Sequence, residues 1–151
     1  MSKLSVIKEL RARTDLGLYE LSRIYDECSG GLDRCLKLIR SRGVEVAKKK
    51  SQRDASHSRL FSYNHLDRIA VIVEISCEND FALRGEVIQE LGDETCFQVV
   101  GTSAETVELL FQQPYVRKPE ILFEEVVNLA QMKINERVVI SRFVRIGIGE
   151  E

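Results

Sequence analysis

The chain has 151 residues, of which 44% are hydrophobic, so it can bury one core, or a small core beside a larger one. Lysine and arginine number 22, aspartate and glutamate number 24, and the formal net charge is only −2. This balance excludes the strong overall field that would by itself indicate a nucleic-acid or membrane binder. Any partner must therefore be selected by local surface features.

Cysteine and histidine residues do not form a metal-binding pattern. The four cysteines include no Cys-x-x-Cys pair, and the two histidines lie away from them in the sequence, so we predict no zinc site and no cofactor. Charged residues interrupt the apolar positions near Met1, and no apolar run approaches the length that spans a membrane. We therefore expect a cytoplasmic protein with reduced thiols and no membrane contact.

Apolar residues at helical spacing predict three helices at the start of the chain. The first ends near Thr14, and the second closes at the Gly30-Gly31 pair, where a left-handed C-terminal cap costs little. The third is predicted to end at Gly43. We therefore predict a compact three-helix domain over residues 1–43.

Residues 44–58 combine a weak apolar rhythm with positive charge, and we interpret them as a basic linker. The lysines at 48–50, Arg53 and Arg59, which directly follows the linker, resemble a strip that binds nucleic-acid phosphates. The segment lacks the interleaved aromatic residues that stack on bases. A solvated helical linker is the favoured interpretation, and a nucleic-acid interface is the alternative.

Strand patterns follow the linker. Residues 59–64 predict a strand and residues 64–67 a turn, after which the stretch RIAVIVEISCENDFALR (68–84) predicts a second strand, so the two form a hairpin. Every second residue from Ile69 to Cys77 is apolar, which makes one face of this strand wholly hydrophobic. This pattern is typical of a central strand.

A single large aromatic residue follows that strand. The polar residues Glu78, Asn79 and Asp80 end the β pattern, and Phe81 comes directly after them. Because most aromatic side chains are buried, composition alone favours a core position for Phe81. The alternative is that its ring is held out for a partner.

The rest of the chain predicts further helices and one more strand. Residues 87–100 fit a helix, and Thr102 with Glu105 resembles a capping box that opens a short helix. Residues 121–134 fit another amphipathic helix, and residues 137–148 return to strand alternation.

The predicted fold class is therefore α+β. An N-terminal three-helix domain (1–43) is followed by the basic linker (44–58). The remaining residues (59–151) form a small core of antiparallel sheet covered by helices.

Motifs of enzyme active sites are absent from the sequence. It contains no glycine-rich phosphate loop, no GxSxG, no HExxH and no Cys-His arrangement. The acidic residues are scattered, so no general acid-base pair can be nominated. We predict no catalytic residues and a protein that acts by pressing its surface against another molecule.

Several motifs, in their order along the chain, resemble the bacterial elongation factor Ts family. They are LSVIKELRARTDLGLYE, SGGLDRCLKLIRSRG, the lysine-rich linker, RIAVIVEISCENDFALR, and PYV followed by ERVVISRFVRIGIGE. The order of several motifs is far more specific than any one of them, and together they span most of the chain.

The resemblance implies a domain of the ubiquitin-associated (UBA) type at the N-terminus and guanine-nucleotide exchange on elongation factor Tu during translation elongation. In that family an Asp-Phe pair wedges against the nucleotide-binding domain and disturbs the magnesium and phosphate sites, and Asp80 and Phe81 match this pair. The resemblance therefore favours an exposed Phe81, and one copy of the chain bound to elongation factor Tu. The implied contact residues are Asn79, Asp80, Phe81, Ala82, Gly17, Leu18 and Tyr19.

Three features depart from the family pattern. The segment 101–114 is much shorter than the usual middle region, and the coiled-coil dimerisation part is missing. Asp15-Leu16 replaces a Gly-Ala pair, and Leu18-Tyr19 replaces two methionines. Asn79 stands where threonine is usual, which removes β-branching before the wedge.

Two alternatives to an exchange factor remain from the sequence. One is an adaptor that binds elongation factor Tu without promoting nucleotide release. The other is a nucleic-acid-binding protein that uses the basic linker.

Overall fold

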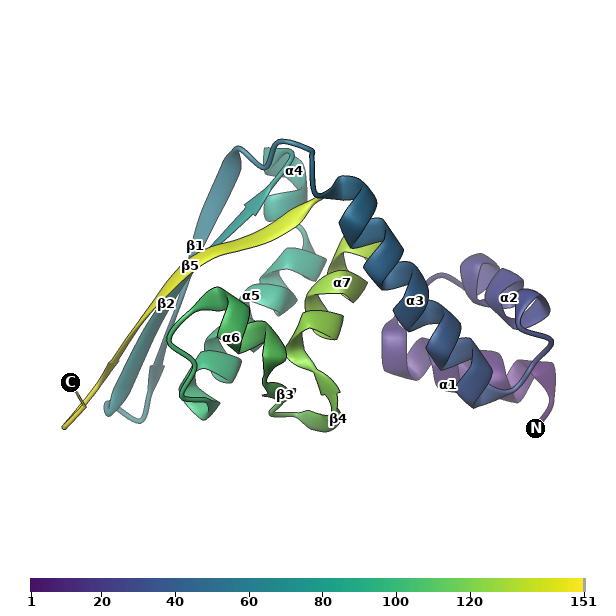
Figure 1. Ribbon diagram of the computed structural model, residues 1–151, viewed down its shortest axis with the longest axis horizontal. Coiled ribbons are helices and arrows are strands. Elements are labelled where there is room, and N and C mark those ends of the chain that lie inside the picture. The colour runs from purple at the N-terminus through teal and green to yellow at the C-terminus, as the bar shows by residue number, and fades with distance from the viewer. Residues whose placement is uncertain (151) are drawn as a thin grey trace.

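The computed structural model describes residues 1–150 as a mixed helix and sheet fold, so the predicted α+β class is confirmed (Figure 1). Glu151, the last residue of the predicted core, lies outside the described residues. The helices are α1 (Lys3–Thr14), α2 (Leu18–Glu27), α3 (Leu32–Lys50), α4 (Asp80–Leu83), α5 (Glu86–Gly101), α6 (Val107–Gln112) and α7 (Phe123–Ile134). The strands are β1 (His57–His65), β2 (Ile69–Cys77), β3 (Pro114–Tyr115), β4 (Lys118–Leu122) and β5 (Val138–Gly147).

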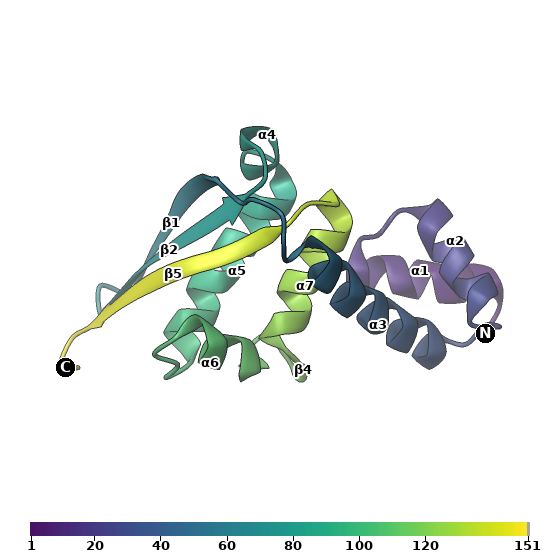
Figure 2. The same ribbon diagram turned by 45° about the horizontal axis from the view of Figure 1, so that its top comes forward.

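Helices α1, α2 and α3 form what we call the helical module, which has a small core of its own. Leu10, Leu21 and Ile24 are fully buried there, as the helical spacing predicts. Leu129 and Met132 of α7 also pack against this core. Helix α7 therefore lies between the helical module and the larger core around the sheet (Figure 2).

The predicted end of the third helix at Gly43 is wrong, because α3 continues to Lys50. Gly43 faces α7, and a Cβ atom there would lie 3.2 Å from the Cβ atom of Asn128. Glycine costs about 1 kcal/mol relative to alanine inside a helix, and close packing of two helices offsets that cost. The first part of the predicted linker is therefore helical, and the division of the chain at residue 43 stays a prediction.

The larger core is built on a three-stranded antiparallel sheet in the order β1-β2-β5, which confirms β2 as the central strand and β1-β2 as a hairpin. Val71, Val73 and Ile75 are buried on the face that α5 and α7 cover (Figure 2). In the predicted turn between the strands, Asn64 Oδ1 accepts a hydrogen bond of 3.0 Å from the backbone N–H of Asp67.

The region between α5 and α7 differs from the prediction. The N-cap of α6 is Thr106, whose Oγ1 accepts a 3.2 Å hydrogen bond from the N–H of Leu109, so the capping box predicted at Thr102 is wrong. Thr102 has extended backbone at the end of α5, and burial of Ala104 in the larger core delays the next helix. The helix predicted from residue 121 begins at Phe123, because Ile121 belongs to the small β3-β4 sheet.

Candidate partner-binding site

The predicted wedge residues lie on α4, a helix of one turn that follows the central strand directly. Asn79 is its N-cap, and its Oδ1 accepts a 2.9 Å hydrogen bond from the N–H of Ala82. Such caps supply a hydrogen-bond acceptor to a backbone N–H of the first turn, which has no acceptor within the helix. Ala82 and Leu83 are buried in the larger core, so they fix the orientation of the turn.

Phe81 points away from the core, because the two residues after it turn inward. Its side chain is 91% exposed, more than any other large hydrophobic side chain in residues 1–150. The core position that composition favours is therefore wrong, and the exposure that the resemblance implies is confirmed. A phenylalanine this exposed loses favourable burial free energy unless a partner covers it.

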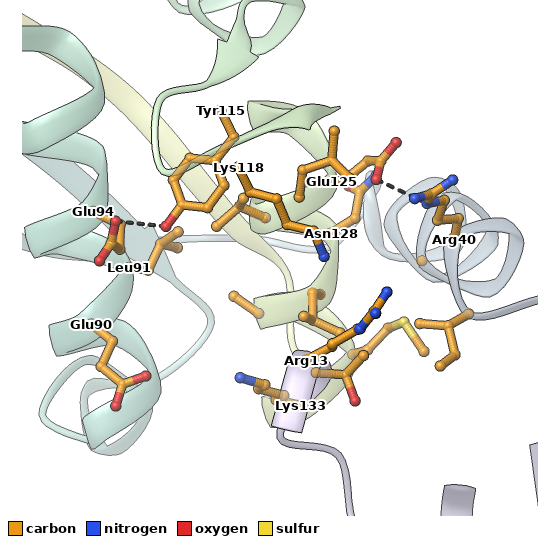
Figure 3. Close-up of a pocket in the computed structure, with 18 of the residues that line it drawn as sticks. Arg13, Arg40, Glu90, Leu91, Glu94, Tyr115, Lys118, Glu125, Asn128 and Lys133 are labelled. Carbon is orange, nitrogen blue, oxygen red and sulfur yellow. Dashed lines mark hydrogen bonds and ion pairs between the residues drawn. The ribbon is translucent and has the colours of Figure 1, made fainter. Parts of the chain in front are cut away.

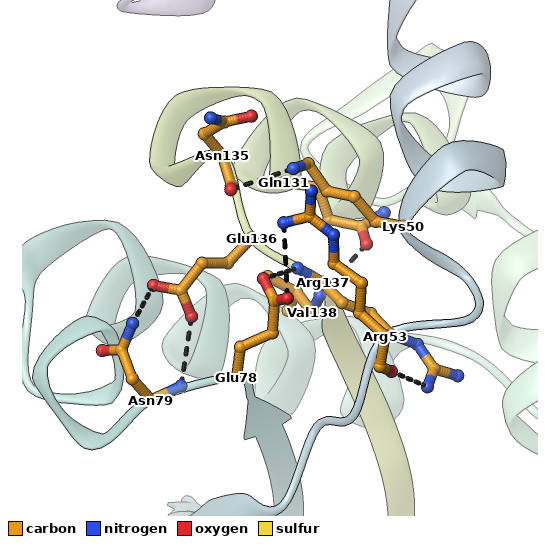
Figure 4. A network of polar contacts seen from close by, with 9 residues as sticks. All are labelled: Lys50, Arg53, Glu78, Asn79, Gln131, Asn135, Glu136, Arg137 and Val138. Carbon is orange, nitrogen blue, oxygen red and sulfur yellow. Dashed lines mark hydrogen bonds and ion pairs between the residues drawn. The ribbon is translucent and has the colours of Figure 1, made fainter.

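A polar network holds α4 against the start of β5 (Figure 4). The Glu136 carboxylate accepts a 3.2 Å hydrogen bond from the backbone N–H of Asn79 and another from the Asn79 side-chain amide. Glu78 accepts a 2.9 Å bond from the backbone N–H of Arg137 and forms a 3.4 Å ion pair with Arg53. Glu78 and Asn79, the two residues before α4, are thereby joined to the segment that leads into β5, so the backbone that presents Phe81 is fixed at the N-terminal end of α4.

Asp80 is accessible beside Phe81. Its carboxylate forms a 2.9 Å ion pair with the Nε atom of Arg84, one helical turn away. Both side chains are well exposed, and such pairs contribute roughly 0 to 1 kcal/mol. A partner can therefore displace Arg84 and bind the Asp80 carboxylate at small cost.

The other predicted contact residues form a second exposed patch, at the start of α2. Leu18 is 54% exposed and Tyr19 is 79% exposed, whereas Leu16 just before them is buried and anchors the turn. Gly17 is the N-cap of α2, and a Cβ atom there would meet no atom within 4 Å. The structure does not bring this patch and α4 together, because α2 belongs to the helical module and α4 to the larger core (Figure 1).

A cavity of about 410 Å³ lies between the helical module and the larger core (Figure 3). Two pairs of its polar groups bond to each other: the Tyr115 hydroxyl donates a 2.6 Å hydrogen bond to Glu94, and Arg40 forms a 3.2 Å ion pair with Glu125. Burial and the bond to Glu94 raise the pKa of the Tyr115 phenol. The Arg40–Glu125 pair joins α3 of the helical module to α7, whereas the Tyr115–Glu94 bond lies within the larger core. Neither pair resembles an acid-base pair.

Among residues 1–150 no group of three or more His, Cys, Asp or Glu side chains is placed to hold a metal ion. Within the same residues, no helix combines the length and the apolar content that crossing a bilayer requires.

The chain is similar from end to end to several curated proteins. It is 26% identical to elongation factor Ts of Thermosipho melanesiensis, over 99% of this chain and 100% of the relative. It is 27% identical to elongation factor Ts of Prochlorococcus marinus strain MIT 9301, over 96% and 88% of the two chains. The predicted resemblance to elongation factor Ts is confirmed. A third relative, elongation factor Ts of Thermodesulfovibrio yellowstonii, is 22% identical over 96% of this chain and 95% of the relative.

No protein-family model matches the chain, in keeping with its divergence from these elongation factor Ts proteins. The alignment with the Thermosipho melanesiensis protein spans 196 positions, whereas this chain has 151 residues, so at least 45 positions of that relative have no counterpart here. Both chains are aligned over 99% or more of their lengths, so the missing positions are internal.

Sequence reasoning missed Glu136, the residue that holds Asn79 in place. Glu136 is 57 positions from Asn79 in the chain, and its neighbours show only a polar turn before a strand. Pairing of β5 with β2 brings Val138 opposite Cys77 and so places the two turns side by side. No local sequence signal could have identified this contact.

Proposed function

We propose that the chain is a guanine-nucleotide exchange factor that acts on elongation factor Tu in translation elongation, by binding and not by covalent chemistry. The observation that carries this proposal is the exposed Phe81 on a helical turn that Asn79 and Glu136 hold in place. The end-to-end similarity to elongation factor Ts proteins supports it.

The proposed mechanism depends on a difference in affinity. Phe81 inserts into the nucleotide-binding domain of the partner, beside Asp80, and this binding is favoured only when the segment that holds magnesium and phosphate has moved. By linkage, a factor that weakens nucleotide binding is itself weakened by nucleotide to the same degree. Because α4 is held rigid before binding, little ordering entropy opposes the insertion.

The helical module contributes affinity in this proposal. Leu18 and Tyr19 offer an exposed apolar and aromatic surface on the separate α2 helix. Contacts that are equal in the loaded and empty states of the partner raise affinity without changing nucleotide release. The two patches therefore have different roles, which kinetics can separate.

Release of fluorescent GDP from elongation factor Tu, with and without this protein at matched magnesium concentrations, tests the proposal. Release should accelerate and saturate with protein concentration, and excess magnesium should reduce the gain because it favours the undistorted state. An adaptor would form a complex on gel filtration and leave release unchanged. If the protein neither accelerates GDP release nor forms a complex with elongation factor Tu, the proposal is wrong.

The nucleic-acid alternative has less support, because some cations of the basic segment are already engaged. Lys50 is buried, and its Nζ donates a 2.9 Å hydrogen bond to the backbone oxygen of Asn135. Arg59 donates to the backbone oxygen of Leu83 at 2.9 Å. RNA binding with a steep salt dependence would revive this alternative.

Asn79→Ala should slow exchange several-fold while leaving the protein folded. Loss of an N-cap costs about 0.5 to 2 kcal/mol, and here that loss frees the turn that carries Phe81. GDP release and thermal unfolding are measured together. Thr106→Ala, which removes the cap of α6, is the matched control and should leave exchange unchanged. If Asn79→Ala promotes GDP release as fast as Thr106→Ala does, a rigid α4 is not required for exchange.

Tyr19→Ala should raise the protein concentration needed for half-maximal exchange about tenfold, the effect of losing roughly 1.4 kcal/mol of binding. The maximal rate should not change, because this patch is proposed to act on affinity. Leu4→Ala, at another exposed residue of the helical module, serves as the control. A lower maximal rate with unchanged half-saturation would contradict the division of roles.

A further inference from the structure

Two thiols of the helical module approach each other closely. Cys28 lies at the C-terminal end of α2 and Cys35 in the first turn of α3, and their sulfur atoms are 2.9 Å apart. A disulfide bond measures about 2.05 Å, and even carbon atoms in contact prefer a separation of ~3.5 to 4.0 Å. The distance between the two sulfur atoms is therefore shorter than an ordinary nonbonded contact and longer than a disulfide bond, and both cysteines are free thiols.

The turn between the two helices holds the sulfur atoms in this position. Ser29, Gly30 and Gly31 all have positive φ, which reverses the chain within three residues. The backbone N–H of Gly30 donates a 3.0 Å hydrogen bond to the backbone oxygen of Tyr25. The backbone N–H of Cys35 donates a 3.1 Å hydrogen bond to the backbone oxygen of Gly31. A bond between the two sulfur atoms thus requires a shift of less than 1 Å and no rearrangement of helices.

The two thiols differ in their access to solvent. Cys28 is half-buried, whereas Cys35 lies behind it in the core of the helical module. Burial and the neighbouring Cys28 raise the pKa of Cys35 to about 12, so Cys35 stays a protonated thiol near neutral pH. The other cysteines, Cys77 and Cys96, are buried in the larger core. An oxidant in solution therefore reaches Cys28 first.

We propose that Cys28 and Cys35 form a reversible oxidation site whose co-substrate is a hydroperoxide. With hydrogen peroxide, the Cys28 sulfur attacks one oxygen and the O–O bond breaks, so that a sulfenic acid forms and the other oxygen leaves with the Cys28 proton as the first water. The Cys35 sulfur then attacks the Cys28 sulfur, the S–O bond breaks, and a second water leaves with the Cys35 proton. Two thiols lose two electrons, and hydrogen peroxide is reduced to two waters.

The disulfide joins the end of α2 to the beginning of α3 and so stabilises the helical module. Leu18 and Tyr19 lie at the opposite end of α2 and stay exposed. Oxidation therefore leaves the patch at the start of α2 uncovered. A dithiol reductant returns both cysteines to thiols by exchange.

Peptide mapping of the full chain after hydrogen peroxide treatment tests this proposal. Remaining thiols are blocked with N-ethylmaleimide in denaturant, and the protein is digested with trypsin. Arg34 lies between the two cysteines, so the disulfide should join peptide 24–34 to peptide 35–37, with two hydrogens fewer than the separate peptides. Peptide 69–84, which carries Cys77, should be recovered alkylated, and dithiothreitol should abolish the joined pair.

Two variants test the order of the steps. In Cys35→Ser the sulfenic acid on Cys28 has no partner thiol, so dimedone should label Cys28; in Cys28→Ser the buried Cys35 should stay unlabelled. The proposal is overturned if peroxide converts wild-type Cys28 to sulfinic acid without forming the joined pair. It is also overturned if Cys77 or Cys96 reacts as fast as Cys28, or if the bond forms between two chains.

Discussion

Phe81→Ala should remove most of the exchange activity and leave the thermal stability almost unchanged. The side chain is 91% exposed, so its loss opens no cavity, and surface substitutions of this kind change stability by about 0.5 kcal/mol or less. An aromatic anchor at an interface contributes roughly 2 kcal/mol or more, which corresponds to a loss of about 30-fold in the efficiency of exchange. GDP release and thermal unfolding followed by circular dichroism are the two measurements.

Leu66→Ala is the matched control, since Leu66 is also a well-exposed apolar residue but lies in the β1-β2 turn, away from α4. It should change neither quantity. If Phe81→Ala instead lowers stability by about 3 to 5 kcal/mol, the ring packs in the core and the wedge proposal is wrong. Unchanged exchange in a folded variant would contradict the proposal equally.

Phe123→Ala should have the opposite pattern, a large loss of stability. Phe123 is fully buried at the start of α7, and its ring centre lies 6.0 Å from that of Tyr115 and 6.5 Å from that of Phe111. Removing a buried phenylalanine costs about 3 to 5 kcal/mol, through lost transfer free energy and the cavity that remains. Because the free energy of unfolding of a whole domain is only about 5 to 15 kcal/mol, this substitution removes a large part of the stability.

Urea denaturation of the wild type and of two variants measures this effect. Leu122→Ala, at the exposed neighbouring residue, should shift the midpoint little, whereas Phe123→Ala should shift it strongly. Similar midpoints for both variants would mean that the junction of α6, β3 and α7 adjusts to fill the space. Exchange activity at a temperature where Phe123→Ala is still folded should be retained, because Phe123 lies outside both exposed patches.

The site was predictable in part. The position of Asp80 and Phe81 after a central strand follows from local pattern, because strand alternation and polar turn residues act over a few neighbours. The direction of the Phe81 ring does not follow from the pattern. It depends on the burial of Ala82 and Leu83 and on the contact of Asn79 with Glu136, a residue of a distant segment.

The sequence by itself determined the helices and strands with strong periodicity, the β1-β2 hairpin and the family resemblance, because these depend on local pattern and motif order. Only the tertiary structure decided that α3 runs through Gly43, that α6 starts after Thr106 and that Cys28 faces Cys35. Helix propensities of residues other than proline differ by about 1 kcal/mol or less per residue, so packing between distant segments readily outweighs them. Each of these features is set by such packing or by a turn whose backbone the sequence pattern does not specify.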